Sequence, residues 1–197
     1  IARLWQTRSK DNGRAYLSYE RAVRMAPALP DGSPERAAVR RLITQALEAM
    51  SQMSAQRGRW DDVVSIGQQR LNLAVEQDEA LQAAAILVEL AQVYEEKLNQ
   101  PIDGFALRIQ AFELAPDLMS IDQLAEIAQK YEQWKPLSEL HIQRVERALA
   151  AKLEVPLDWV LAASSILEEK LGDPIQAFRL LKKSLPITVS SAMAATN

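Results

Sequence analysis

The stretch from Leu87 to Pro116 constrains the fold most, because it carries two apolar helical patterns separated by a turn. In its first half, apolar side chains recur at i, i+3, i+4, i+7 and i+11, the spacing of one helix face. These are Leu87, Leu90, Ala91, Tyr94 and Leu98. After a break at 99–103, a second pattern places Phe105, Ile109 and Phe112 on one face and Leu107, Ala111 and Leu114 on another. A single hairpin cannot cover both faces of its second helix, so a neighbouring hairpin must supply the remaining contacts.

Other parts of the chain repeat this pattern in fixed registers. A shift of 89 places Gly104 on Ala15 and Pro116 on Pro27, a shift of 74 places Trp134 on Trp60, and a shift of 162 places Phe178 on Tyr16. The registers predict hairpins at about 1–27, 33–77, 79–116, 120–152 and 156–185. Together they form one repeat domain over 1–186, which is followed by an irregular tail at 187–197 because Pro186 is expected to end regular structure.

Composition favours helices throughout the chain. Of its 197 residues, 48% are hydrophobic, 25% are charged and only 6% are aromatic, and alanine and leucine dominate the apolar set. This composition suits close helix packing better than sheets rich in β-branched and aromatic residues. The predicted fold is therefore all-α: a right-handed α-solenoid of about five antiparallel helix hairpins.

Several classes of function are disfavoured by what the sequence contains. The chain has no cysteine and one histidine, which excludes thiolate and multi-histidine metal sites, and we expect no metal or cofactor. The formal charge of -3 disfavours a nucleic-acid partner, and no apolar run is long enough to span a bilayer. We expect a cytoplasmic protein without membrane insertion. The chain begins at Ile1 rather than methionine, which leaves a processed product and an excised fragment both open.

The fourth hairpin shows most clearly that the chain resembles the tetratricopeptide repeat. Leu124, Ala125, Ala128, Trp134 and Leu137 occupy the small and large packing positions of that family's two helices. The odd-numbered hairpins depart from the family by one extra residue in the turn, so half-a-tetratricopeptide and other α-solenoid repeats stay open as alternatives. The resemblance covers nearly the whole chain and specifies architecture rather than partner.

In the tetratricopeptide family the first helices line a concave groove that binds peptides or partner helices, and the resemblance implies such a groove here. Transferred by position, its residues are Arg3, Gln6, Gln52, Gln56, Gln92, Glu95, Glu96, Glu126, Gln129, Lys130, Ser165, Glu168 and Glu169. The asparagine and lysine set with which some members hold a C-terminal carboxylate is missing from these positions. The groove is polar and mildly acidic, and we expect it to accept a neutral or basic segment of another protein.

Two pairs of adjacent acidic residues, Glu95/Glu96 and Glu168/Glu169, invite comparison with catalytic acid/base pairs. Neighbouring residues on a helix point about 100° apart, so neither pair converges on one substrate atom. A solvated helix face or a groove contact is the better interpretation. His141 has no second histidine or cysteine to join it as a ligand, and we assign it to the surface or to packing between repeats.

The tryptophans and one group of arginines are the remaining candidates. Trp60 and Trp134 occupy equivalent turn positions, which favours packing between the helices of each hairpin over ligand binding. Trp159 precedes an apolar stripe and is the better candidate for an exposed contact. A local basic cluster has no interleaved aromatic residues and no nucleic-acid motif, so we treat phosphate binding there as a minor alternative. The cluster comprises Arg36, Arg40, Arg41, Arg57 and Arg59.

Taken together, these patterns predict a non-enzymatic scaffold for protein–protein interaction, which binds a partner through the groove or through an end of the array. Two alternatives stay open. The chain could be a structural spacer or a self-associating segment of a longer repeat protein, or a scaffold of the kind found in RNA processing.

Overall fold

The computed structural model describes residue 2, residues 11–25 and residues 34–194, with side chains as far as Ser184. Within these ranges every regular element is a helix, which confirms the predicted all-α class. In chain order the helices are α2 (Asn12–Arg24), α3 (Pro34–Gln56), α4 (Trp60–Glu76), α5 (Ala80–Glu96), α6 (Pro101–Leu114), α7 (Ile121–Tyr131), α8 (Trp134–Ala150), α9 (Leu157–Ser165) and α10 (Pro174–Ala194). A π-helical turn, η1 (Ile166–Lys170), directly follows α9. Among the helices described, none is both long and apolar enough to cross a membrane.

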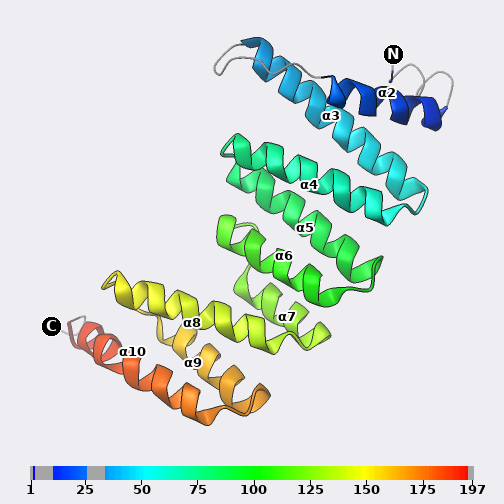
Figure 1. The fold of residues 1–197 in the computed structure, drawn as a ribbon. Coiled ribbons are helices and arrows are strands. Elements are labelled where there is room, and N and C mark those ends of the chain that lie inside the picture. Colours follow the sequence, from blue (N-terminus) through cyan, green and yellow to red (C-terminus); the bar gives the residue numbers. More distant parts are fainter. Residues whose placement is uncertain (1, 3–10, 26–33, 195–197) are drawn as a thin grey trace. The chain divides into compact units, whose positions relative to one another are not determined.

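The chain divides into two compact units, Ile1–Leu118 and Met119–Asn197. The boundary lies between the third and fourth predicted hairpins, and one repeat domain over 1–186 stays a prediction. Breaks between helices at 57–59, 97–100, 132–133 and 171–173 lie at or beside the turns expected from the sequence. The break expected at 99–103 ends earlier, because α6 begins at Pro101, and Trp60 and Trp134, expected in turns, begin α4 and α8. Successive helices pack as antiparallel pairs in each unit (Figure 1).

In the first unit, each described helix packs chiefly against the next one along the chain. One buried cluster joins Ala15 of α2, Leu47, Met50 and Met53 of α3, and Ile66 of α4. The helix α3 is therefore covered by α2 on one side and by α4 on the other. This arrangement meets the requirement that neighbouring hairpins complete one another's core.

The helices α5 and α6 share the most extensive contact in the first unit, and Gly104 allows it. A Cβ atom at this position would lie 2.6 Å from Cγ of Glu95 and 2.9 Å from the carbonyl oxygen of Ala91. Any larger side chain would thus push α6 away from the backbone of α5. The predicted stripe on α5 is buried at Leu87, Leu90 and Ala91.

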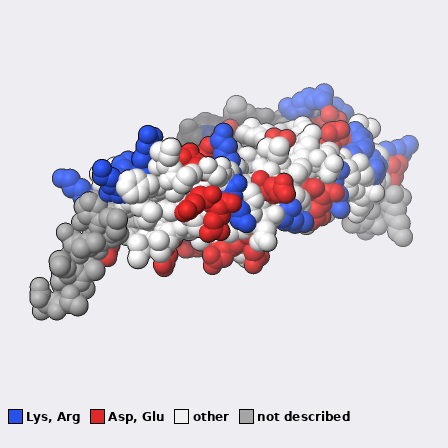
Figure 2. Space-filling view, turned by 90° about the horizontal axis from the view of Figure 1, so that it is seen from below, with Lys and Arg blue, Asp and Glu red and all other residues white. Residues whose placement is uncertain are grey.

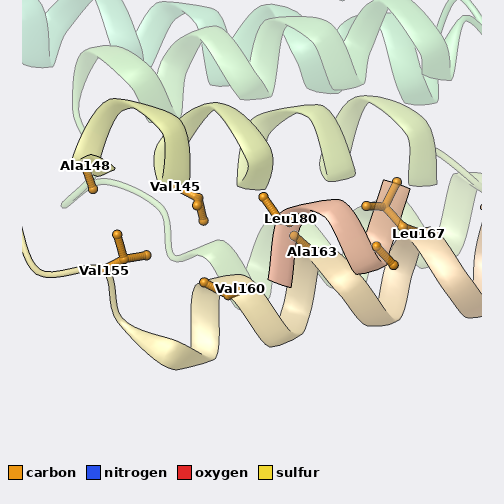
Figure 3. Close-up of a cluster of buried hydrophobic side chains, with 8 residues drawn as sticks. Val145, Ala148, Val155, Val160, Ala163, Leu167 and Leu180 are labelled. Atoms are coloured by element: carbon orange, nitrogen blue, oxygen red, sulfur yellow. The ribbon is translucent and has the colours of Figure 1, made fainter. Parts of the chain in front are cut away.

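The second unit begins with a capping box. Ser120 Oγ accepts a hydrogen bond from the backbone N–H of Gln123 at 3.1 Å, and Gln123 Oε1 accepts one from the N–H of Ser120 at 2.9 Å. These reciprocal bonds satisfy donors at the start of α7, as the spacing in the sequence predicted. A buried apolar cluster joins α8, α9, η1 and α10, together with Val155 from the segment before α9 (Figure 3). Its members are Val145, Ala148, Val155, Val160, Ala163, Leu167, Ala177 and Leu180.

Two features of the C-terminal hairpin differ from the sequence prediction. The helix α10 continues through Pro186 to Ala194, so most of the expected irregular tail at 187–197 is helical. Proline removes one backbone hydrogen-bond donor, which weakens a helix without always ending it. Phe178, expected on the packing side of this helix, is instead exposed.

Candidate functional site

The described groove candidates are exposed on the first helices of their hairpins, with one exception. Gln52 and Gln56 lie on α3, and Gln92 and Glu96 lie on α5, where Gln92 Nε2 donates a hydrogen bond to Glu96 Oε1 at 3.1 Å. The exposed candidates of the second unit are Glu126, Gln129 and Lys130 on α7, Ser165 at the end of α9, and Glu168 and Glu169 in η1. Arg3 and Gln6 lie outside the described residues.

Glu95 is the exception, because it is buried inside the hairpin formed by α5 and α6. Its side chain is 4% exposed, and its two carboxylate oxygens accept hydrogen bonds from Arg108 Nε at 2.7 Å and Arg108 Nη2 at 2.8 Å. This bidentate geometry is the strong form of an arginine–carboxylate contact. Glu95 is therefore paired with Arg108 inside the hairpin and is not exposed on its surface.

The exposed side chains of Glu89, Gln92 and Glu96 form a polar stripe on α5, and this stripe also contacts the neighbouring helix α4. Glu89 Oε2 accepts a hydrogen bond from Arg70 Nη1 of α4 at 2.7 Å, and the side chain of Arg70 is largely buried. Glu96 Oε2 lies 3.8 Å from Lys97 Nζ. Glu89 and Glu96 therefore each have a cation beside them. Only the Glu96–Lys97 pair is exposed on both sides, and an exposed ion pair of this kind contributes little to stability.

Neither pair of adjacent glutamates forms a converging acid/base site. Glu95 is buried against Arg108 while Glu96 is exposed, so the two carboxylates of this pair have separate surroundings. In η1, Glu168 and Glu169 are both exposed, and Glu169 Oε1 accepts a hydrogen bond from Ser165 Oγ at 3.0 Å. The described residues also contain no group of three or more His, Cys, Asp or Glu side chains that could hold a metal ion.

Trp60 and Trp134, which begin α4 and α8, are each covered by a lysine from the following hairpin. Lys97 Nζ lies 5.6 Å from the ring centroid of Trp60, and Lys170 Nζ lies 5.0 Å from that of Trp134. The two contacts are equivalent by position, because in each case the lysine lies at the end of the first helical segment of the next hairpin. We expected packing within each hairpin, whereas these contacts join successive hairpins through cation–π attraction.

Trp159 and His141 are also packed inside the second unit: Trp159 is half-buried and His141 is buried. The guanidinium of Arg144 lies 3.9 Å from the ring centroid of Trp159, which packs half-buried against the core of the second unit. Trp159 is therefore not the exposed contact expected from the sequence. His141 is buried on α8, and burial, followed by the positive charge of Arg144, lowers its pKa.

Three clefts in the first unit were not anticipated from the sequence. One of about 390 Å³ is lined by Tyr16 and Glu20 of α2, Met50 of α3, and Asp62 and Gln69 of α4, among others. Another of about 450 Å³ lies along α6, and a third of about 660 Å³ adjoins α2 and α3. These clefts involve second helices, while the prediction considered only first helices.

The likeness found by comparison with known proteins is structural and distant. No protein-family model matches the chain, and no curated protein matches it. Among solved structures it is similar to the crystal structure of BtubC (BKLC) from P. vanneervenii, with 17% sequence identity and a TM-score of 0.42. The match covers 97% of this chain and 78% of that one. A likeness at this distance assigns neither family nor function.

Proposed function

We propose that the protein is a non-enzymatic scaffold that binds a segment of another protein on the exposed polar faces of its first helices. The observation that carries the proposal is the division of α5 into two sides. Leu87, Ala91 and Glu95 are buried in the unit, while Gln92 and Glu96 remain exposed. The exposed side is held on a helix that is packed on both flanks.

A surface of this kind binds without large rearrangement. The packing of α5 against α4 and α6 fixes the backbone before a partner arrives, which reduces the ordering cost of association. Amide and carboxylate groups at Gln92 and Glu96 offer hydrogen bonds to a partner's backbone or polar side chains. Separated carboxylates without a converging partner group also favour binding over catalysis.

The chemistry of the stripe favours a neutral or basic partner segment. Glu96 is only loosely paired with Lys97, since 3.8 Å separates their charged atoms. A lysine or arginine from a partner could approach this carboxylate at a shorter distance. An acidic segment would instead meet Glu89 and Glu96 at like charge, which disfavours binding.

The test compares two double variants of the whole chain. Gln92→Ala with Glu96→Lys alters the exposed stripe of α5, and Gln68→Ala with Glu76→Lys makes the same chemical changes at exposed positions of α4. Glu95 must stay unchanged, because its loss would disturb the hairpin itself.

Peptides selected against the unaltered protein by display are titrated into each variant by fluorescence anisotropy. We expect the selected peptides to be neutral or basic and to bind the α5 variant about tenfold more weakly, with the α4 variant unaffected. Equal affinity for all three proteins would rule out the stripe on α5 as the binding surface. A selected set dominated by acidic peptides would refute the assigned partner chemistry.

A further inference from the structure

The C-terminal hairpin exposes large apolar side chains on both of its helices. Ile175 and Phe178 of α10 are 65% and 66% exposed, and Leu157 and Leu161 of α9 are 50% and 49% exposed. Each pair is spaced by one helical turn, so each forms a short apolar stripe. Grouped apolar side chains on a protein surface commonly mark an interaction site.

The two stripes lie on the same side of the hairpin. Contacts with α8 mark the other side: Lys183 Nζ of α10 bonds Glu146 Oε1 at 2.8 Å, and Arg144 stacks on Trp159 of α9. With 100° of rotation per residue, the apolar stripes of both helices turn away from α8. Figure 1 shows α8 above α9 and α10, and Figure 2, which views the molecule from below, shows white side chains between acidic and basic groups.

Internal repetition indicates that this position is one that a helix normally covers. Phe178 corresponds to Tyr16 in the first hairpin and to Phe105 in the third. Tyr16 is half-buried and packs against the cluster that contains Leu47 and Met50 of the next hairpin, and Phe105 is fully buried. Of the three equivalent aromatic side chains, only Phe178 is exposed in the described part of the chain.

The charges around the apolar stripes are self-complementary. On α9 and η1 the exposed acidic residues Asp158, Glu168 and Glu169 outnumber one exposed lysine, Lys170. On α10 the exposed charged residues with described side chains are all basic: Arg179, Lys182 and Lys183. A twofold axis parallel to the helices would set α10 of one copy over the α9 segment of the other. The basic edge of each copy would then meet the acidic edge of its partner, around an apolar centre.

We propose that this outer face of α9 and α10 binds the same face of a second copy of the chain. The surface that covers Tyr16 within the chain is unavailable as an alternative partner, because α2 already occupies it. The complementary charges of the two helices are the reason for choosing a second copy as the occupant. The proposal goes beyond partner binding on α5 and concerns a different unit, so either can fail while the other holds.

Sedimentation velocity of the whole chain between about 1 and 100 μM tests the proposal. We expect the unaltered protein to pass from monomer to dimer as its concentration rises, and Phe178→Glu to raise the dimer dissociation constant more than about tenfold. The matched control is Leu81→Glu, at an α5 side chain that is 64% exposed, which should leave the dimer unchanged. Circular dichroism establishes that both variants are folded.

The electrostatic part has its own test. Lys182→Glu and Glu168→Lys should each weaken the dimer, because each places like charges opposite one another. The two changes together should restore the dimer, because the charges on the basic and acidic edges are then exchanged and again pair as opposites. An unaltered protein that stays monomeric over the whole range would overturn the proposal, as would a folded Phe178→Glu variant that dimerises normally. Failure of the double charge exchange to restore association would overturn the proposed pairing of edges.

Discussion

Replacing Glu95 with glutamine should destabilise the first unit strongly, although glutamine has nearly the same shape. The side chains of Glu95 and Arg108 are 4% and 14% exposed, so the change leaves a buried guanidinium without its charge partner. Breaking a buried ion pair by removing one member costs about 3–5 kcal/mol. We expect a loss of about 3 kcal/mol, at the lower end, because part of Arg108 still reaches water.

Urea unfolding followed by circular dichroism measures this loss. With an m-value of about 1–3 kcal/mol per molar urea, 3 kcal/mol lowers the midpoint by about 1–3 M. A loss below about 1 kcal/mol would show that water already satisfies Glu95, which would refute the assignment of this residue to the interior.

A matched substitution and a double variant sharpen the test. Glu96→Gln changes the neighbouring exposed carboxylate in the same way and should shift stability by less than about 0.5 kcal/mol. Glu95→Met combined with Arg108→Leu should cost less than Glu95→Gln alone, since an apolar pair leaves no buried charge behind. A double variant as unstable as the single one would contradict the ion-pair explanation and would indicate a packing defect beside Gly104.

Three further predictions concern other parts of the chain. Since burial and Arg144 lower the pKa of His141 below the ordinary value of 6.5, the unfolded state binds a proton that the folded state resists, and stability should fall as pH drops below about 6.5. Thermal unfolding from pH 7.5 to 5.5 checks this, and His141→Leu, which removes the chain's single histidine, should abolish that pH dependence. Phe112→Ala truncates a buried side chain and should cost about 3–5 kcal/mol in urea unfolding; below 1 kcal/mol, the assigned helix face would be wrong. Ser120→Ala removes the capping box of α7 and should cost about 1 kcal/mol, whereas an unchanged midpoint would show that the cap contributes nothing.

Apolar spacing was sufficient to predict the helices and their turns. The stripe that includes Leu87 and Leu90 is buried as expected, and the break around Pro101 separates α5 from α6. Pro186 misled the prediction, because a proline weakens a helix without always ending it. The division after Leu118 could not be predicted, since it depends on how extensively distant segments pack.

The candidate site was predicted less completely, because charge was equated with exposure. Glu95 lies four residues after Ala91 and eight after Leu87, so the helical period alone placed it on the buried side. Two residues across the turn also indicated that Glu95 could be buried. Arg108 supplies the cation that a buried carboxylate needs, and Gly104 leaves space for its side chain. Phe178 shows the converse error: an apolar residue at a repeat position is buried only where another helix covers it.

Hydrogen exchange with and without a bound partner peptide tests the central claim most directly, namely that the exposed polar sides of the first helices bind other proteins. Mass spectrometry of the whole chain would report the change in amide protection for each helix. We predict added protection in α5, with little change in the neighbouring second helices α4 and α6. Protection confined to α4 and α6, with α5 unchanged, would contradict the account.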